Sequence, residues 1–116
     1  MDKLRVTGLT LSALIGERAW ERRIRQTIRI DLEFDVDAAR AAATDDLAQA
    51  LDYGVVARRV TELVGGSEFK LIETLAERIA TCVLDEFRVP RIRVVVHKPN
   101  AVPTAHDTSI EIERAR

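Results

Sequence analysis

Alternation of hydrophobic and polar side chains is clearest at Thr27–Asp37, where apolar residues stand at every second position. A period of two predicts a strand with one buried face and one solvated face. A second strand is predicted at Leu4–Leu11, but its alternation changes phase at Gly8, which a β-bulge at that glycine would explain. Arg91–Lys98 and Thr108–Glu113 alternate in the same way and complete a set of four strands.

Hydrophobic residues at helical spacing predict two helices between the second and third strands. The first has Asp52 at its N-cap position and Gly65-Gly66 at its end. The second spans Leu71–Phe87 and carries one apolar stripe. The Ala-rich segment Ala38–Ala50, which precedes both, is either a loop or a short helix. This order of elements predicts an α+β fold, with a four-stranded antiparallel sheet and two helices on one face (ββααββ).

Length and charge narrow the class of protein. With 116 residues, we expect one domain that spans residues 1–116. The 18 basic and 19 acidic residues leave no basic excess, so we expect no nucleic-acid partner. No apolar run approaches the roughly 20 residues of a membrane helix, and no export signal stands at the N-terminus, so we expect no membrane contact. The single cysteine fits a reducing compartment, and we expect a cytoplasmic protein.

The inventory of reactive side chains argues against metal and cofactor chemistry. His97 and His106 are the only histidines, Cys82 is the only thiol, and neither HExxH nor CxxC spacing occurs. Glycine-rich dinucleotide and nucleoside-triphosphate motifs are also missing. We therefore expect neither a metal nor another cofactor, and acid–base chemistry by Glu, Lys, Tyr and main-chain groups.

Four short motifs give the sequence its specificity. They are GERAWERRIRQ at 16–26, DLAQALDY at 46–53, FKLIETLAE at 69–77 and HKPNA at 97–101. In this order, with these elements between them, the chain resembles the dihydroneopterin aldolase family along its whole length. The resemblance implies the tunnelling fold, whose subunits join their sheets into a barrel shared by four chains, with two such rings stacked as an octamer.

The resemblance also implies the reaction and the site that binds the substrate. The family cleaves 7,8-dihydroneopterin into 6-hydroxymethyl-7,8-dihydropterin and glycolaldehyde, a retro-aldol step of folate biosynthesis. The ring imine of the pterin accepts the electrons of the broken bond, so a positioned proton donor and acceptor suffice. By the resemblance, Glu73 accepts hydrogen bonds from the amino group and ring N–H of the pterin. Main-chain groups of Leu71 and Ile72 hold its carbonyl side.

Three further residues are assigned catalytic roles by the same resemblance. Lys98 shares its parity with apolar residues of the third predicted strand, and the family match makes it the acid–base residue rather than a lysine at a strand end. Glu21 is either a solvated ion-pair partner or, by the match, the carboxylate that binds the side-chain hydroxyls and couples to Lys98. Tyr53 either packs beside a helix start or, by the match, moves the proton of the leaving hydroxyl, from a neighbouring subunit.

Two departures from the family pattern keep other functions open. Glu17-Arg18-Ala19 replaces a frequent Val-Tyr-Glu run near the expected entrance for the substrate side chain, and Asp52 replaces a frequent Asn. The alternatives are a dihydroneopterin triphosphate epimerase, which re-adds glycolaldehyde to the opposite face of its carbonyl, and a non-catalytic pterin-binding ring.

Other charged residues are expected to play structural roles. His97 alternates to the face opposite Lys98, so we expect it to be solvated. The basic cluster of Arg22, Arg23 and Arg25 is expected to offset the acidic residues of Asp31–Asp37.

Overall fold

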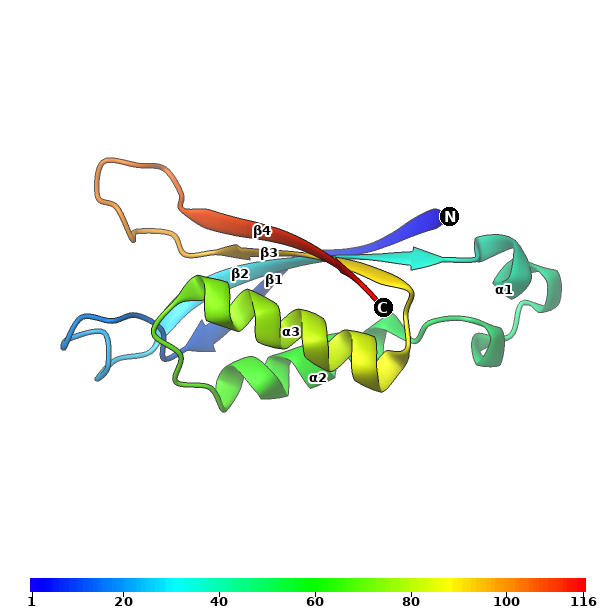
Figure 1. Ribbon diagram of the computed structural model, residues 1–116, viewed down its shortest axis with the longest axis horizontal. Helices are drawn as coiled ribbons and strands as arrows, with labels where there is room; N and C mark the ends of the chain where they lie inside the picture. Colours follow the sequence, from blue (N-terminus) through cyan, green and yellow to red (C-terminus); the bar gives the residue numbers. More distant parts are fainter.

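Four antiparallel strands in the order β1-β2-β3-β4 form one sheet, and two long helices cross one of its faces (Figure 1). The computed structural model describes residues 1–116. Its elements are β1 (Asp2–Ala13), β2 (Gln26–Val36), α1 (Ala38–Thr44), the 3-10 helix η1 (Leu47–Gln49), α2 (Tyr53–Gly65), α3 (Ile72–Phe87), β3 (Arg91–His97) and β4 (Ser109–Ala115). The predicted α+β arrangement is confirmed.

The change of phase in the first strand is a β-bulge, as predicted. The register between β1 and β2 shifts between Val6 and Leu9, and Gly8 adopts a φ of 74°. Glycine reaches this left-handed region without a Cβ clash. The main-chain N–H of Gly8 donates to Oδ1 of Asp31 at 2.8 Å, so β2 holds the bulge in place.

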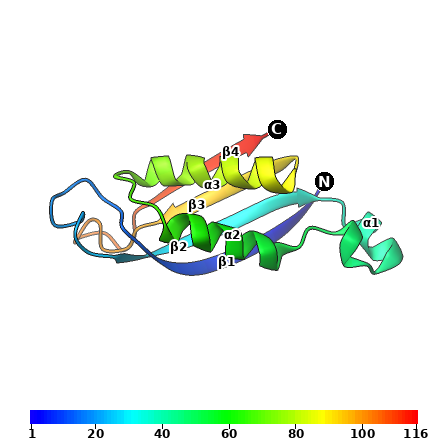
Figure 2. The same ribbon diagram turned by 90° about the horizontal axis from the view of Figure 1, so that it is seen from below.

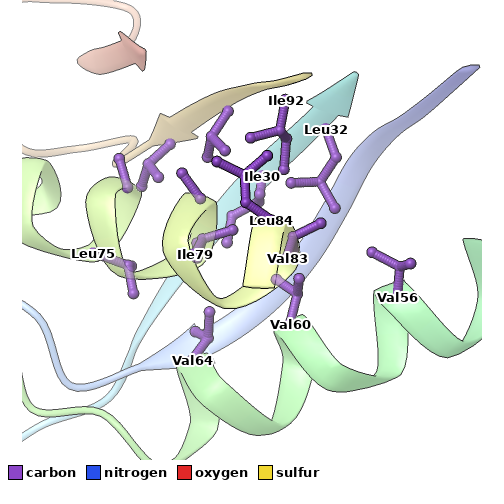
Figure 3. Close-up of a cluster of buried hydrophobic side chains, with 14 of the residues drawn as sticks. Ile30, Leu32, Val56, Val60, Val64, Leu75, Ile79, Val83, Leu84 and Ile92 are labelled. Atoms are coloured by element: carbon purple, nitrogen blue, oxygen red, sulfur yellow. The ribbon is translucent and has the colours of Figure 1, made fainter. Parts of the chain in front are cut away.

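The core lies between the sheet and the two long helices (Figure 3). The helices supply buried side chains at helical spacing, and β2 and β3 supply theirs at every second position, as each periodicity predicts. Members of this core include Val56, Val60 and Val64 of α2, Leu75, Ile79 and Val83 of α3, and Ile30, Leu32 and Ile92 of the sheet. Each such side chain contributes about 1.5–3 kcal/mol by its burial.

The Ala-rich segment that could have been loop or helix contains two short helices, α1 and η1. Asp37 caps α1 by accepting from the N–H of Arg40, and Asp46 caps η1 by accepting from the N–H of Ala48. Neither helix contains a buried residue. Both project from one end of the sheet (Figures 1 and 2).

Three loops lie at the opposite end of the molecule in both views (Figures 1 and 2). They are the β1–β2 loop at 14–25, the α2–α3 loop at 66–71 and the β3–β4 loop at 98–108. The third strand was predicted to include Lys98 but ends at His97, so Lys98 is the first residue of its loop. None of the helices is long and apolar enough to cross a lipid bilayer.

Candidate active site

The three loops enclose a cleft of about 550 Å³. Five of the six predicted site residues line it: Glu21, Leu71, Ile72, Glu73 and Lys98. Residues far apart in sequence line this cleft because of how the two long helices lie. They run side by side, and the α2–α3 loop that connects them lies at the end of the sheet where β1 and β3 finish. Acidic, basic and main-chain groups therefore share one small volume.

Glu21 and Lys98, which both line this cleft, form an ion pair. Nζ of Lys98 donates to Oε2 of Glu21 at 2.5 Å, and the two side chains are only 13% and 8% exposed respectively. Lys98 is fixed at its backbone, because its N–H donates to the carbonyl of Thr108 at 2.8 Å. Glu21 is thus a buried carboxylate, and its interpretation as a solvated surface acid is wrong.

The environment of Glu21 favours its ionised form. Burial acts to raise its pKa, but the hydrogen bonds from Lys98, Gln26 and the N–H of Arg18 outweigh that effect and lower it. Gly16 makes room for this carboxylate: a Cβ at that position would overlap it, and the φ of 130° is one that other residues rarely adopt. The result is a fixed negative charge paired with a fixed ammonium.

The other side of the cleft is the start of α3. Leu71 is the N-cap residue, and its side chain makes no capping hydrogen bond. The first N–H groups of a helix have no intrahelical partner, so they are free to donate to an acceptor in the cleft. Glu73 lies in the first turn, exposed and without a hydrogen-bond or ion-pair partner. A planar heterocycle that presents adjacent donors and an acceptor would find matching groups here.

Tyr53 is the predicted site residue that does not reach this cleft. It is the first residue of α2, it is 57% exposed, and it lines a second cleft of about 450 Å³ beside α1 and η1. Because α2 has 13 residues, its two ends lie about 20 Å apart. Within one chain, Tyr53 and Lys98 therefore belong to opposite ends of the molecule.

The sequence predicts a solvated His97, but most of its side chain is shielded from water. Its side chain is 18% exposed, and its Nε2 and Nδ1 lie 2.8 and 2.6 Å from carboxylate oxygens of Asp31 and Asp107. Burial acts to lower the pKa of His97, but these two carboxylates raise it. The sheet face on which His97 lies was predicted correctly. On that face, however, charged side chains shield one another from water, so alternation alone does not predict how exposed a side chain is.

The basic cluster at 22–25 also differs from its expected role. Arg22 donates to main-chain carbonyls of the loops, and Arg25 donates to main-chain carbonyls at the ends of β1 and α2, so neither pairs with the acids of β2. Those acids pair instead with basic residues of the neighbouring strands, such as Arg5 and Arg91 with Glu33.

Sequence reasoning also missed Gln26, whose Nε2 donates to Oε2 of Glu21 at 3.2 Å and to the carbonyl of Ile15 at 2.7 Å. A signal for it was present. Gln26 shares the parity of the buried residues Ile28 and Ile30, so it is a polar residue at a core-facing position. Such a residue needs buried partners, and Glu21 is one of them.

Comparison with known proteins places the chain, over nearly its full length, in a family. The profile of dihydroneopterin aldolase matches residues 4–113 of the chain. A dihydroneopterin aldolase from Streptomyces coelicolor is 40% identical over 118 residues, which cover 100% of this chain and 99% of that protein. The crystal structure of Escherichia coli dihydroneopterin aldolase in complex with neopterin superposes with a TM-score of 0.96. It is 36% identical, and the match covers 99% of this chain and 100% of that one.

A more distant match shows the fold alone. Urate oxidase from Bacillus sp. TB-90 superposes with a TM-score of 0.69 at 11% identity, over 100% of this chain and 45% of that one. The sheet with two helices on one face is therefore shared with enzymes of different sequence.

Proposed function

The chain belongs to the dihydroneopterin aldolase family, a family of lyases, and on that premise we propose how its cleft binds and cleaves the substrate. The substrate is 7,8-dihydroneopterin, and the products are 6-hydroxymethyl-7,8-dihydropterin and glycolaldehyde. The observation that carries the proposal is the presence of the Glu21–Lys98 pair and the free Glu73 carboxylate in one cleft.

Glu73 and the start of α3 bind the pterin ring in this proposal. The Glu73 carboxylate accepts from the amino group and the adjacent ring N–H, a pair of donors that matches its two oxygens. The main chain at Leu71 and Ile72 holds the ring carbonyl. Two observations support this role: Glu73 has no partner within the chain, and the helix has no side-chain cap. Neopterin bound to the Escherichia coli relative has the same ring system.

Glu21 and Lys98 handle the side chain and the protons. The hydroxyl beyond the breaking bond loses its proton and becomes the carbonyl of glycolaldehyde. The electrons of the first side-chain carbon–carbon bond pass to the ring imine, whose nitrogen Lys98 protonates. The remaining side-chain carbon then takes up a proton, which balances the one lost by the hydroxyl, and the ring nitrogen returns its proton to Lys98. The imine is thereby restored and the hydroxymethyl product remains. Glu21 orients the hydroxyls and holds Lys98 in place, so proton transfer occurs between positioned groups.

Tyr53 completes the site from a neighbouring subunit in this proposal. Its hydroxyl helps to remove the proton of the leaving hydroxyl. Its distance from Lys98 within one chain and its 57% exposure support a role across an interface. β1 and β4 are open sheet edges, which can pair with the edges of other copies. A ring of four chains, stacked in pairs as an octamer, is the assembly we propose.

The test is incubation of the purified protein with 7,8-dihydroneopterin, followed by chromatography of the products. Equal amounts of 6-hydroxymethyl-7,8-dihydropterin and glycolaldehyde are expected. Unchanged substrate would refute an aldolase. Epimerisation is the second candidate, because the charged pair Glu17 and Arg18 lines the same cleft and changes the environment of the substrate side chain. Formation of dihydromonapterin without cleavage would favour it.

A further inference from the structure

We infer that Arg22 is a positioning residue that holds the two halves of the active site in register. The inference rests on the proposed function, since it concerns the roles of Glu21 and of the α3 start in that reaction. Arg22 follows Glu21 directly but does not line the cleft. Arg22 is half-buried, and its guanidinium contacts both the β1–β2 loop and the α2–α3 loop.

Three main-chain carbonyls accept hydrogen bonds from this one guanidinium. Nη1 donates to the carbonyl of Gly16 at 2.9 Å and to that of Phe69 at 3.2 Å, and Nη2 donates to the carbonyl of Glu68. The only main-chain hydrogen bond between the two loops runs from the N–H of Gly16 to the carbonyl of Phe69, at 3.3 Å. Arg22 therefore supplies most of the polar contact that joins these loops.

The two loops that Arg22 joins serve different parts of the proposed site. Gly16 makes the space that the Glu21 carboxylate occupies, whereas Phe69 lies two residues before Leu71, where the ring-binding segment begins. The guanidinium is planar and rigid, with several donors in fixed directions, so it fixes the spacing of the carbonyls that it binds. Displacement of one loop relative to the other would move the hydroxyl-binding carboxylate away from the bound ring. Misplacement of about 1 Å can reduce turnover about a hundredfold.

Arg25 provides a matched control within the same loop. Its guanidinium also ties the β1–β2 loop to neighbouring segments, because it donates to the Ser12 carbonyl and the Gly65 carbonyl, each at 3.0 Å, and to the Ser12 hydroxyl. These contacts lie at the end of β1 and the end of α2, outside the cleft. Arg25 thus makes as many hydrogen bonds as Arg22, but none of them joins the two sides of the site.

The experiment compares Arg22→Ala with Arg25→Ala and with Arg23→Ala, since the Arg23 side chain is exposed and makes no hydrogen bond. For Arg22→Ala we expect kcat on 7,8-dihydroneopterin to fall about tenfold or more, while the affinity for pterin without a side chain stays within about twofold. Arg25→Ala and Arg23→Ala should keep kcat. A purely structural role for Arg22 would lower thermal stability in both Arg22→Ala and Arg25→Ala but would not separate kcat from ring affinity.

Amide hydrogen exchange gives a second measurement that needs no turnover. Arg22→Ala should speed exchange of the Gly16 amide by a larger factor than exchange of core amides in β2, and Arg25→Ala should not. Failure of wild-type protein to cleave the substrate would refute the proposed function but leave this measurement to decide whether Arg22 joins the loops. An unchanged kcat in Arg22→Ala, an equal loss in Arg25→Ala, or unchanged exchange at Gly16 would overturn the inference.

Discussion

Nζ of Lys98 lies 2.5 Å from Oε2 of Glu21, although 77 positions separate the two residues in sequence. Both side chains are mostly buried, so each charge depends on the other for the interactions that water would otherwise supply. Glu21 reaches this position from the β1–β2 loop and Lys98 from the end of β3. The pair is therefore a property of the tertiary fold, and it links the acid–base residue to the residue that orients the substrate hydroxyls in the proposed mechanism.

Replacement of Lys98 should separate binding from chemistry. Lys98→Ala removes the proposed proton donor but leaves Glu73 and the start of α3 unchanged. We expect kcat to fall about 10²–10⁴-fold, with the affinity for the pterin ring, measured by fluorescence titration, within about threefold of wild type. Lys3→Ala is the control, because Lys3 pairs with Asp35 outside the cleft. Turnover close to that of wild type in Lys98→Ala would show that Lys98 is not the acid–base residue.

Gly16 should tolerate no side chain. The Cβ of Gly16→Ala would overlap the Glu21 carboxylate, and alanine is strained by about 1–3 kcal/mol at a φ of this kind. We expect a lower midpoint of thermal unfolding and a fall in kcat of about tenfold or more, because Glu21 must leave its position beside Lys98. Gly65→Ala is the matched control, since a Cβ there meets no atom within 4 Å. Equal kcat values in the two variants would contradict the assigned role of Gly16.

Much of this fold could be predicted from periodicity, because each element buries a regular stripe. The bulge at Gly8 and the N-cap at Asp52 could also be predicted, since both depend on a residue and its immediate neighbours. The segment 38–50 could not be assigned in advance: its short helices bury no residue, so they leave no apolar pattern to detect.

The site was harder to predict from the sequence than the fold, because its contacts join residues that are far apart in the chain. Motifs identified Glu21, Glu73 and Lys98 as candidates, but only the fold shows that these residues line one cleft. The partners of Arg22 are main-chain carbonyls, which every residue has, so the sequence contains no complementary signal for them. For the same reason, the acids of β2 were a plausible prediction for the partners of the basic cluster at 22–25, but that prediction was wrong.

His97 should make the stability of the protein depend on pH. Its pKa is raised above the ordinary value of 6.5 because Asp31 and Asp107 outweigh the effect of burial. The stabilisation is therefore fully present below 6.5 and is lost as pH rises through the pKa of the folded state. The pKa values of both carboxylates are lowered, so the contribution is also lost when acid protonates them.

Urea unfolding at a fixed protein concentration tests this dependence. At pH about 6, His97→Gln should reduce the free energy of unfolding by about 1.5–3 kcal/mol, the range for hydrogen bonds to charged groups. The difference from wild type should shrink as pH increases to about 9. His106→Gln is the control, because His106 is exposed and makes no hydrogen bond. A difference that stays constant over this range would show that His97 is not charged between the two carboxylates.

Mixing of two inactive variants tests whether the active site is shared between subunits. Tyr53→Phe lacks the hydroxyl proposed to act from a neighbouring chain, and Lys98→Ala lacks the ammonium of the cleft. Each variant alone should show little turnover. If Tyr53 and Lys98 of one site come from different chains, random co-assembly of equal amounts restores both wild-type residues to about a quarter of the sites. The measurement is turnover after joint unfolding and refolding of the two variants.

The control is the same mixture of the two proteins without unfolding, in which subunits stay with their original partners and turnover should remain low. In a second control, a chain that carries both substitutions is refolded with wild-type protein. This mixture measures how much turnover is lost through co-assembly itself. Restoration to about a quarter of wild-type turnover requires that the two side chains meet across an interface. No restoration after refolding, with assembly confirmed by light scattering, would mean that the two residues act from one chain or in different sites. The length of α2, about 20 Å, argues against action of both residues from one chain. An absence of restored turnover would therefore remove Tyr53 from the proposed mechanism.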